Sequence, residues 1–278
     1  MQAAGTRSEI LQKQQRLLEN LRELGSVIVA YSGGADSAYL AWAAHQALGD
    51  RALAVTADSA SLPRSHKADA EEFVAEWGIP YEAIETREFD NPDYAANGPD
   101  RCFHCKDELF HRLEEMAQAR GVARVIYGVN QDDLGDYRPG QKAARLHEVK
   151  APLVEAGLTK AEIRELSRAA GLKTWDRPAA ACLSSRIPYG TPVTIENVRM
   201  VELGEEELKA LGFRQFRVRF HDKLVRIEIA PAELPRALTP EMASEFTRIF
   251  KALGFDYVTL DLEGYRQGSL NAALKVLD

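Results

Sequence analysis

The sequence predicts an α/β protein: a parallel sheet with helices on both faces in residues 1–190, then a smaller α/β domain in residues 191–278. Short apolar runs rich in β-branched residues alternate with longer segments whose apolar residues recur at helical spacing, and this alternation builds parallel sheets. A length of 278 residues suits two domains of about 150 residues each. A long loop at 173–190 precedes the expected boundary near Thr191.

The first domain is expected to begin with a helix that Gly25 ends. Residues 26–31, Ser-Val-Ile-Val-Ala-Tyr, are predicted to form a buried strand. Thr159 and Glu162 form a capping box at the start of the domain's last helix. The predicted strands are 26–31, 52–57, 81–84 and 124–128, and the predicted helices are 10–24, 37–48, 66–77, 107–119 and 160–170.

The second domain is expected to contain a hairpin, because two alternating runs flank a short turn. Lys-Ala-Leu-Gly-Phe at 209–213 recurs at 251–255, where each Gly would cap a helix and each Phe would pack beyond it. Either two similar helix-to-strand joints or an internal duplication of a small α/β unit would explain the repeat. The predicted elements are a helix at 196–211, strands at 214–220 and 224–229, a helix at 241–253 and a strand at 257–262.

The composition is that of an ordinary soluble protein, with 45% apolar and 28% charged residues. A net charge of −7 argues against a general electrostatic affinity for nucleic acid. The apolar runs are too short to span a bilayer, and residues 1–9 lack the apolar core of a secretion signal. We therefore expect a cytoplasmic protein that binds neither nucleic acid nor membranes.

Residues 32–37, Ser-Gly-Gly-Ala-Asp-Ser, lie between a predicted strand and the start of a helix. Free backbone N–H groups and the helix dipole bind anions at such a junction, and glycines let the backbone approach a phosphate closely. Asp36 would bind Mg²⁺ that accompanies a nucleotide. A plain glycine-rich turn is the alternative, but the whole pattern is more specific than two glycines. The candidate phosphate-binding residues are Ser32, Gly33, Gly34, Asp36 and Ser37.

All three cysteines are predicted to lie in loops that border the first domain. Cys102 and Cys105 form a Cys-x-x-Cys pair, and Cys182 lies in the long loop. Three thiolates could hold a [4Fe–4S] cluster and leave one iron without a protein ligand. With His104 or His111 they could instead bind zinc, or they could be free or redox-active thiols.

Three basic residues, Arg101, Lys106 and Arg186, flank the cysteines. They would lower the pKa of the thiols and attract a phosphate or an adenylate. Each of them alone also fits an ordinary surface charge. At the ends of other predicted strands, Asp58, Ser59 and a polar loop lie where open α/β sheets place ligands. The polar loop contains Asn130, Asp132, Asp133, Asp136 and Arg138, whose individual roles the sequence does not separate.

Several motifs together resemble the LarE family, ATP-dependent sulfur transferases of nickel-pincer nucleotide biosynthesis within the PP-loop ATP pyrophosphatase superfamily. The resemblance spans nearly the whole chain. It rests on residues 31–37, Arg-Cys-Phe-His-Cys-Lys at 101–106, Gly-Val-Asn-Gln-Asp-Asp at 128–133, Asp-Tyr-Arg-Pro-Gly at 136–140, residues 151–160, Thr-Trp-Asp-Arg-Pro at 174–178, residues 182–190 and Leu-Asp-Leu-Glu-Gly-Tyr-Arg at 260–266.

The resemblance implies a Rossmann-like sheet and an enzyme that adenylates a carboxylate of a pyridinium dicarboxylate mononucleotide, releasing pyrophosphate. Sulfur then replaces AMP and yields a thiocarboxylate. The implied ATP and Mg²⁺ residues are those of the phosphate loop with Asp58, Ser59, Asn130 and Asp132. The expected substrate residues are Arg101, Lys106, Ser185, Arg217 and Arg219, the last two because they share one face of a predicted strand and suit a phosphate.

Two branches of the family differ in their sulfur source. In one, a single cysteine at the position of Cys182 gives up its sulfur; in the other, three cysteines hold a [4Fe–4S] cluster that carries a sulfide. Because this chain has Cys102 and Cys105 as well, we favour the cluster-dependent branch, with Cys182, Asp36 and Arg186 as catalytic residues.

The resemblance also implies an upstream carboxylase and a downstream nickel-inserting enzyme as partners, and a homo-oligomer. The alternatives within the superfamily are a tRNA thiolase, which the net charge of −7 disfavours, and an ammonia-dependent ligase, for which no glutaminase region is visible. A nucleotide-sensing or zinc-binding module without catalysis is the alternative from another class.

Overall fold

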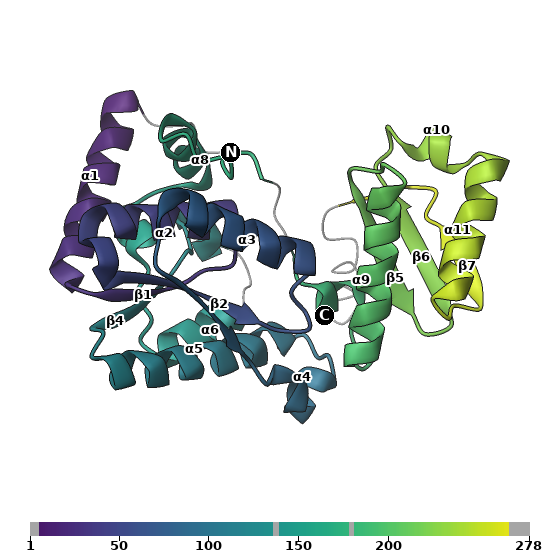
Figure 1. The fold of residues 1–278 in the computed structure, drawn as a ribbon, viewed down its shortest axis with the longest axis horizontal. Coiled ribbons are helices and arrows are strands. Elements are labelled where there is room, and N and C mark those ends of the chain that lie inside the picture. Colours follow the sequence, from purple (N-terminus) through teal and green to yellow (C-terminus); the bar gives the residue numbers. More distant parts are fainter. Residues whose placement is uncertain (1–5, 136–138, 178–180, 267–278) are drawn as a thin grey trace. The chain divides into compact units, whose positions relative to one another are not determined.

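The computed structural model describes residues 6–135, 139–177 and 181–266 and divides into two compact units (Figure 1). The first unit contains residues 1–88 and 102–180, and the second contains residues 89–101 and 181–278. The predicted Asp136 and Arg138 lie outside the described residues.

This division differs from the predicted boundary near Thr191, because hydrogen bonds join residues 89–101 to the segment after 181. Asn97 Nδ2 donates to the carbonyls of Pro188 and Thr191, each at 2.8 Å, and the hydroxyls of Tyr94 and Ser184 lie 2.7 Å apart. The second unit therefore includes a piece of chain that precedes the cysteine pair in the sequence.

The first unit contains a parallel sheet in the order β3-β2-β1-β4, which confirms the predicted α/β class. Its strands are β1 (Val27–Ala30), β2 (Ala52–Asp58), β3 (Tyr81–Glu85) and β4 (Arg124–Tyr127). Because all four run in the same direction, their carboxyl ends meet at one edge. In the sequence, the phosphate loop and the polar loop follow two of these ends, and Asp58 is the last residue of β2.

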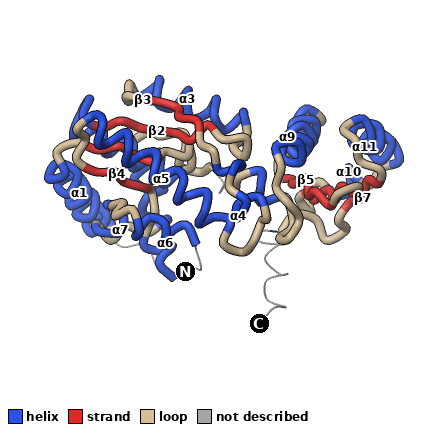
Figure 2. Tube along the Cα trace, turned by 90° about the horizontal axis from the view of Figure 1, so that it is seen from below, coloured by secondary structure: helices blue, strands red, loops and turns tan. Residues whose placement is uncertain are grey.

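Helices cover both faces of this sheet (Figure 2). Alternate residues of β1 point to opposite faces: Val29 joins a core with α1, α2, α3 and α8, and Ile28 joins a core with α5 and α6. The helices are α1 (Arg7–Leu24), α2 (Ala35–Leu48), α3 (Arg64–Trp77), α5 (Arg101–Arg120), α6 (Pro139–Leu146), α7 (Pro152–Glu155) and α8 (Lys160–Ala169). Short 3-10 turns lie at η1 (Gly49–Arg51), η2 (Glu88–Asp90) and η3 (Gln131–Gly135).

The predicted capping box is confirmed at the start of α8, where Glu162 N–H donates to Thr159 Oγ1 and Thr159 N–H donates to a Glu162 carboxylate oxygen. Lys13 on α1 also pairs with Glu162 at 2.7 Å. One carboxylate therefore both caps α8 and ties α1 to it.

The prediction that Cys102 and Cys105 lie in a loop is wrong. Both lie in the first turns of α5, which begins at Arg101, six residues before the predicted start. The run from 101 to 106 contains no glycine, proline or β-branched residue that would end a helix, and Pro99 comes just before it. Cys182 does lie outside regular helix, at the residue before the 3-10 turn η4 (Leu183–Arg186).

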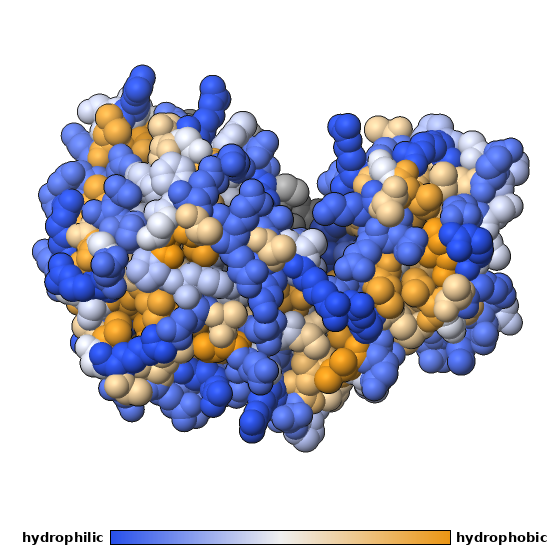
Figure 3. Space-filling model, viewed as in Figure 1, coloured by the Kyte–Doolittle hydropathy of each residue, from blue (hydrophilic) through white to orange (hydrophobic). Residues whose placement is uncertain are grey.

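The second unit contains a three-stranded sheet in the order β5-β6-β7. The predicted hairpin is confirmed by the antiparallel pairing of β5 (Phe216–His221) with β6 (Leu224–Ile229), and β7 (Tyr257–Leu260) lies parallel to β6. The helices are α4 (Pro92–Ala95), α9 (Ile195–Ala210), α10 (Leu234–Ala237) and α11 (Pro240–Ala252). Apolar surface is visible between α9 and α11 on the face in view (Figure 3).

The two copies of Leu-Gly-Phe end α9 and α11 in the same way. Gly212 and Gly254 have φ of +83° and +102°, which favours glycine. Phe213 N–H donates to Leu208 O, and Phe255 N–H donates to Phe250 O, each at 3.1 Å. Both predicted helix-to-strand joints are thus present. Across the described residues, every helix is too short or too polar to cross a membrane.

His147 fastens the end of α6 to α5. Its Nδ1 lies 2.8 Å from a Glu114 oxygen and its Nε2 lies 2.9 Å from an Asp107 oxygen, while the His111 ring is 6.5 Å away. Burial lowers the pKa of His147, but the hydrogen bonds to Glu114 and Asp107 outweigh burial, and the net pKa is raised. Both ring nitrogens can donate only in the protonated imidazolium.

We expect His147→Gln to destabilise the protein by about 1 kcal/mol at acidic pH and by less as the pH rises. The folded-state pKa lies above the unfolded value of about 6.5, so the stabilisation is complete below that pH and is lost as the pH passes the folded pKa. Urea unfolding of both proteins across a pH series measures it. His111→Gln, whose ring is 60% exposed, is the control, and a pH-independent difference for His147→Gln would contradict the prediction.

Candidate functional site

The phosphate loop connects β1 to α2 and is braced from inside by Ser37. Ser37 Oγ accepts the N–H of Ser32 at 3.2 Å and donates to the Gly34 carbonyl at 3.1 Å. Gly33 has φ of +73°, and a Cβ there would lie 3.3 Å from the Cβ of Ala70 on α3. Only glycine therefore fits both the backbone conformation and the space at this position.

A second glycine, Gly128 at the end of β4, touches the start of α2. A Cβ on Gly128 would lie 2.9 Å from both the backbone N and the Cα of Ser37, closer than real atoms approach. The absence of a side chain at residue 128 thus lets the polar loop after β4 lie directly against the phosphate loop.

Asp36 lies in the first turn of α2 and faces Asn130, which the sequence also predicted. Asn130 Nδ2 donates to Asp36 Oδ2 at 3.2 Å, whereas the buried Asp36 Oδ1 has no hydrogen-bond partner among the described residues. Burial raises the pKa of Asp36; Lys160 opposes that shift and Asp133 adds to it. A buried carboxylate oxygen without a partner is a suitable ligand for a divalent cation such as Mg²⁺.

Asp132 and Asp133 have structural contacts in the same loop. The exposed Asp132 accepts the backbone N–H of Lys160 at 2.8 Å and so caps α8, and the buried Asp133 accepts the N–H of Asn130 at 3.2 Å. These contacts bring Lys160 toward Asp36. A role of Asp132 in binding Mg²⁺ stays a prediction.

Asp58 and Ser59 lie at the carboxyl end of β2, on the same edge of the sheet as the phosphate loop. Asp58 forms an ion pair with Lys67 on α3. Ser59 Oγ lies 2.9 Å from Ser61 Oγ and also donates to the buried Glu88. Contact of Asp58 and Ser59 with an adenosine stays a prediction.

The three cysteines are divided between the two units. Cys102 is exposed and Cys105 half-buried, three residues apart on α5, and Cys182 is half-buried in the second unit. Residues three apart on a helix are neighbours on its surface, so both thiols of the pair can face the same side. Among the described residues, no three His, Cys, Asp or Glu side chains form a group that could hold a metal ion.

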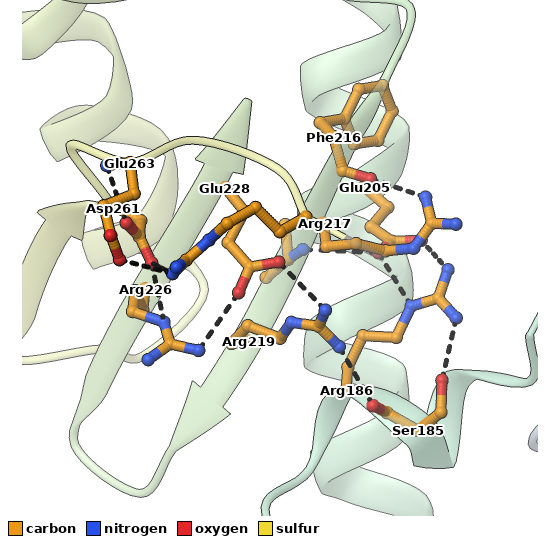
Figure 4. Close-up of polar contacts among 12 residues, drawn as sticks. Ser185, Arg186, Glu205, Phe216, Arg217, Arg219, Arg226, Glu228, Asp261 and Glu263 are labelled. Carbon is orange, nitrogen blue, oxygen red and sulfur yellow. Dashed lines mark hydrogen bonds and ion pairs between the residues drawn. The ribbon is translucent and has the colours of Figure 1, made fainter. Parts of the chain in front are cut away.

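Arg186 holds the turn that follows Cys182 (Figure 4). Arg186 is 2% exposed, and its guanidinium makes a two-point ion pair with Glu205 on α9, at 2.9 and 3.0 Å. Its Nη1 donates to the carbonyls of Ala181 and Cys182 at 2.7 and 3.0 Å. A buried cation with a carboxylate and two carbonyl partners fixes the backbone at Cys182.

Arg217 and Arg219 lie on one face of β5, as their spacing predicts, but their surroundings differ (Figure 4). Arg219 is buried, pairs with Glu228 at 2.9 Å and donates to the Ser185 carbonyl at 3.0 Å. Arg217 lies 5.0 Å from the centre of the Tyr265 ring, and among the described residues it has no ion pair with a carboxylate. Burial, and next the charge of Arg186, lower the pKa of Arg217.

Arg101 is buried and Ser185 is half-buried, and both belong to the second unit. Arg101 is 4% exposed, and its Nη1 donates to the carbonyl of Ser184 at 2.9 Å and to Asn97 Oδ1. Ser185 Oγ donates to the Cys182 carbonyl at 2.7 Å. Lys106 on α5 lies over the Phe110 ring at 5.9 Å. The structure gives these residues local contacts, and their binding of substrate stays a prediction.

The structure thus brings two sets of predicted residues together, one in each unit. Sequence reasoning missed four residues that position them: Gly128, Lys160, Glu205 and Arg177. Lys160 directly follows the predicted capping residue Thr159, which was a usable signal. Glu205 and Arg177 act through contacts between segments far apart in the sequence, which no local pattern reveals.

Comparison with known proteins covers nearly the whole chain. Residues 10–133 match the NAD synthase family. An uncharacterized protein of Synechocystis sp. is 45% identical over 92% of this chain and 97% of its own length. The pyridinium-3,5-bisthiocarboxylic acid mononucleotide synthase of Lactiplantibacillus plantarum is 36% identical over 94% of this chain and 95% of its own. A component of the glutamine-hydrolyzing GMP synthase of Archaeoglobus fulgidus is 28% identical over 66% of this chain and 65% of its own.

We expect Gly128→Ala to lower the stability by about 1–3 kcal/mol and to weaken the binding of pyrophosphate, because the added methyl group must displace the start of α2. Gly135→Ala is the matched control, since a Cβ there meets no atom within 4 Å. Thermal unfolding and calorimetric titration with pyrophosphate test the pair. Equal behaviour of the two variants would contradict the close approach of β4 to the loop.

Proposed function

The chain belongs to the family of the pyridinium-3,5-bisthiocarboxylic acid mononucleotide synthase, and we propose that it is an ATP-dependent sulfur transferase acting on a pyridinium dicarboxylate mononucleotide. The observation that carries the proposal is the phosphate loop between β1 and α2, in whose first helical turn one Asp36 oxygen has no hydrogen-bond partner within the described part of the chain. Identity of 36% over 94% of the chain supports the choice of substrate class. The match of residues 10–133 to the NAD synthase family supports the use of ATP.

The first proposed step activates a carboxylate of the substrate. A carboxylate is a poor electrophile, so one of its oxygens attacks the α-phosphorus of ATP, and the bond from that phosphorus to the pyrophosphate oxygen breaks. The products are an acyl-adenylate and pyrophosphate. Backbone N–H groups of the phosphate loop and the hydroxyls of Ser32 and Ser37 would bind the departing pyrophosphate. Asp36, oriented by Asn130, would hold Mg²⁺, which when bound offsets negative charge on the phosphates.

The second proposed step forms the thiocarboxylate. A sulfur nucleophile attacks the carbonyl carbon of the acyl-adenylate, and the carbon–oxygen bond to AMP breaks, so that AMP leaves with the bonding electrons. We favour a sulfur carrier held by Cys102, Cys105 and Cys182. A [4Fe–4S] cluster with three cysteine ligands has an iron that could carry the transferable sulfide. The presence of two cysteines three residues apart on α5, in addition to Cys182, supports this choice.

The proposed site for the phosphate of the substrate lies on β5. Arg219 and Arg186 have carboxylate partners, so their charges are largely compensated. Arg217 has none among the described residues, and the lowered pKa of its guanidinium reflects burial and nearby positive charge. A bound anion would compensate the positive charge of Arg217 and so oppose the lowering of its pKa by burial and by nearby positive charge. We therefore assign direct contact with the phosphate to Arg217, and to Arg219 the positioning of the Ser185 backbone through its carbonyl. The product would pass to a nickel-inserting enzyme, and a carboxylase would supply the substrate.

We expect the protein to release AMP and pyrophosphate from ATP only when the dicarboxylate mononucleotide is present. Asp36→Asn should slow the release about 100-fold, because a neutral amide holds Mg²⁺ poorly. Asp50→Asn, an exposed carboxylate beyond the far end of α2, is the control. A coupled pyrophosphate assay measures the rates. Release that depends on tRNA or on ammonia would instead identify a thiolase of RNA or a ligase, and no release would reject an enzyme of this class.

We expect protein purified without oxygen to contain about four irons and four sulfides per chain, and Cys102→Ser and Cys105→Ser to lose both. Iron and sulfide analysis with mass spectrometry after turnover tests this. Bound zinc without iron would overturn the cluster. Loss of hydrogen sulfide from Cys182 during turnover, with full transfer by the two serine variants, would identify the branch that consumes its own cysteine.

A further inference from the structure

Arg177 connects the phosphate loop to two helices of the first unit. Its Nη1 donates to the carbonyl of Gly33 at 2.9 Å, and its Nη2 lies 3.0 Å from an Asp69 oxygen on α3. Its own carbonyl accepts a hydrogen bond from Arg164 on α8 at 3.1 Å. One guanidinium thus holds the loop while an acidic partner and a neighbouring helix hold Arg177 itself.

The bond to Gly33 determines the direction of the next N–H group. A trans peptide is planar, and its C=O and N–H point to opposite sides. The carbonyl of Gly33 points at Arg177, so the N–H of Gly34 points away from Arg177. Among the described residues, that N–H donates to no acceptor. It is therefore available to an anion at the start of α2.

We propose that Arg177 is a positioning residue for the pyrophosphate of ATP, and that it orients the peptide between Gly33 and Gly34 so that the Gly34 N–H faces the phosphates. The inference rests on the proposed function and adds to it the residue that sets the donor geometry of the loop. Glycines stand on both sides of this peptide, and neither has a Cβ to restrict its backbone angles, so a contact from outside the loop is needed to fix the orientation of the peptide.

An arginine suits this task better than a lysine. The planar guanidinium can donate to the Gly33 carbonyl with one nitrogen and pair with the Asp69 carboxylate through another. A lysine keeps the charge but has only one nitrogen to share between the two partners. A glutamine keeps a donor and loses the charge.

The test compares the affinities of ATP, pyrophosphate and AMP, measured by calorimetry on the full chain. We expect Arg177→Gln to lower the affinity for ATP and for pyrophosphate by about 10- to 100-fold. The affinity for AMP should fall by less than about twofold, because AMP lacks the pyrophosphate. Arg177→Lys should restore part of the affinity. Arg120→Gln is the matched control: it also removes a two-point pair, with Glu82 on β3 at 2.6 and 2.7 Å, at the opposite edge of the sheet.

A loss of AMP affinity as large as that of ATP would overturn the inference, because it would mean a general disturbance of the unit. Unchanged ATP affinity in Arg177→Gln would overturn it as well. If that variant does not fold, Asp69→Asn, which keeps Arg177 but removes its anchor, should give a smaller loss with the same selectivity for pyrophosphate-bearing ligands. A wild-type protein that binds neither ATP nor pyrophosphate would reject the proposed function itself.

Discussion

Backbone N–H groups at the start of α2 that have no acceptor among the described residues are the feature on which the proposed use of ATP depends. A helix always leaves its first N–H groups unpaired, and here the surrounding residues brace the loop without occupying them. Ser37 Oγ accepts a hydrogen bond from the Ser32 N–H, and Arg177 Nη1 donates to the carbonyl of Gly33. Gly128 leaves room for the neighbouring loop. The result is a braced loop whose Gly34 N–H is available to an anion.

The second unit has a different constraint, because it buries positively charged arginine side chains. Arg186 and Arg219 are 2% and 6% exposed, and a buried guanidinium is tolerated only with good partners. Glu205 and Glu228 supply the opposite charge, and the carbonyls of Cys182 and Ser185 accept further hydrogen bonds from the two guanidinium groups. The backbone next to Cys182 is therefore held by ion-paired arginines that connect it to α9 and the sheet, in addition to the hydrogen bonds of its own short 3-10 turn.

The two constraints divide the proposed reaction. The proposed activation by ATP takes place in the first unit, whose phosphate loop supplies backbone N–H donors for phosphate. Cys182 and the arginines proposed for the substrate phosphate belong to the second, and the other two cysteines belong to the first.

The sequence by itself determined the strands, most of the helices and the phosphate loop, because each depends on local periodicity, on caps such as Thr159 or on glycines in a short run. It placed Asp36 and Asn130 at strand ends that a parallel sheet must bring to one edge, and the structure joins them at 3.2 Å. Only the tertiary structure decided that residues 89–101 belong to the second unit. It also decided that Glu205 forms the ion pair with Arg186 and that Arg177 donates a hydrogen bond to the Gly33 carbonyl. These depend on contacts between residues 19 to 144 positions apart. The partner of a buried charge is chosen by packing in three dimensions, and a linear pattern carries no record of that choice.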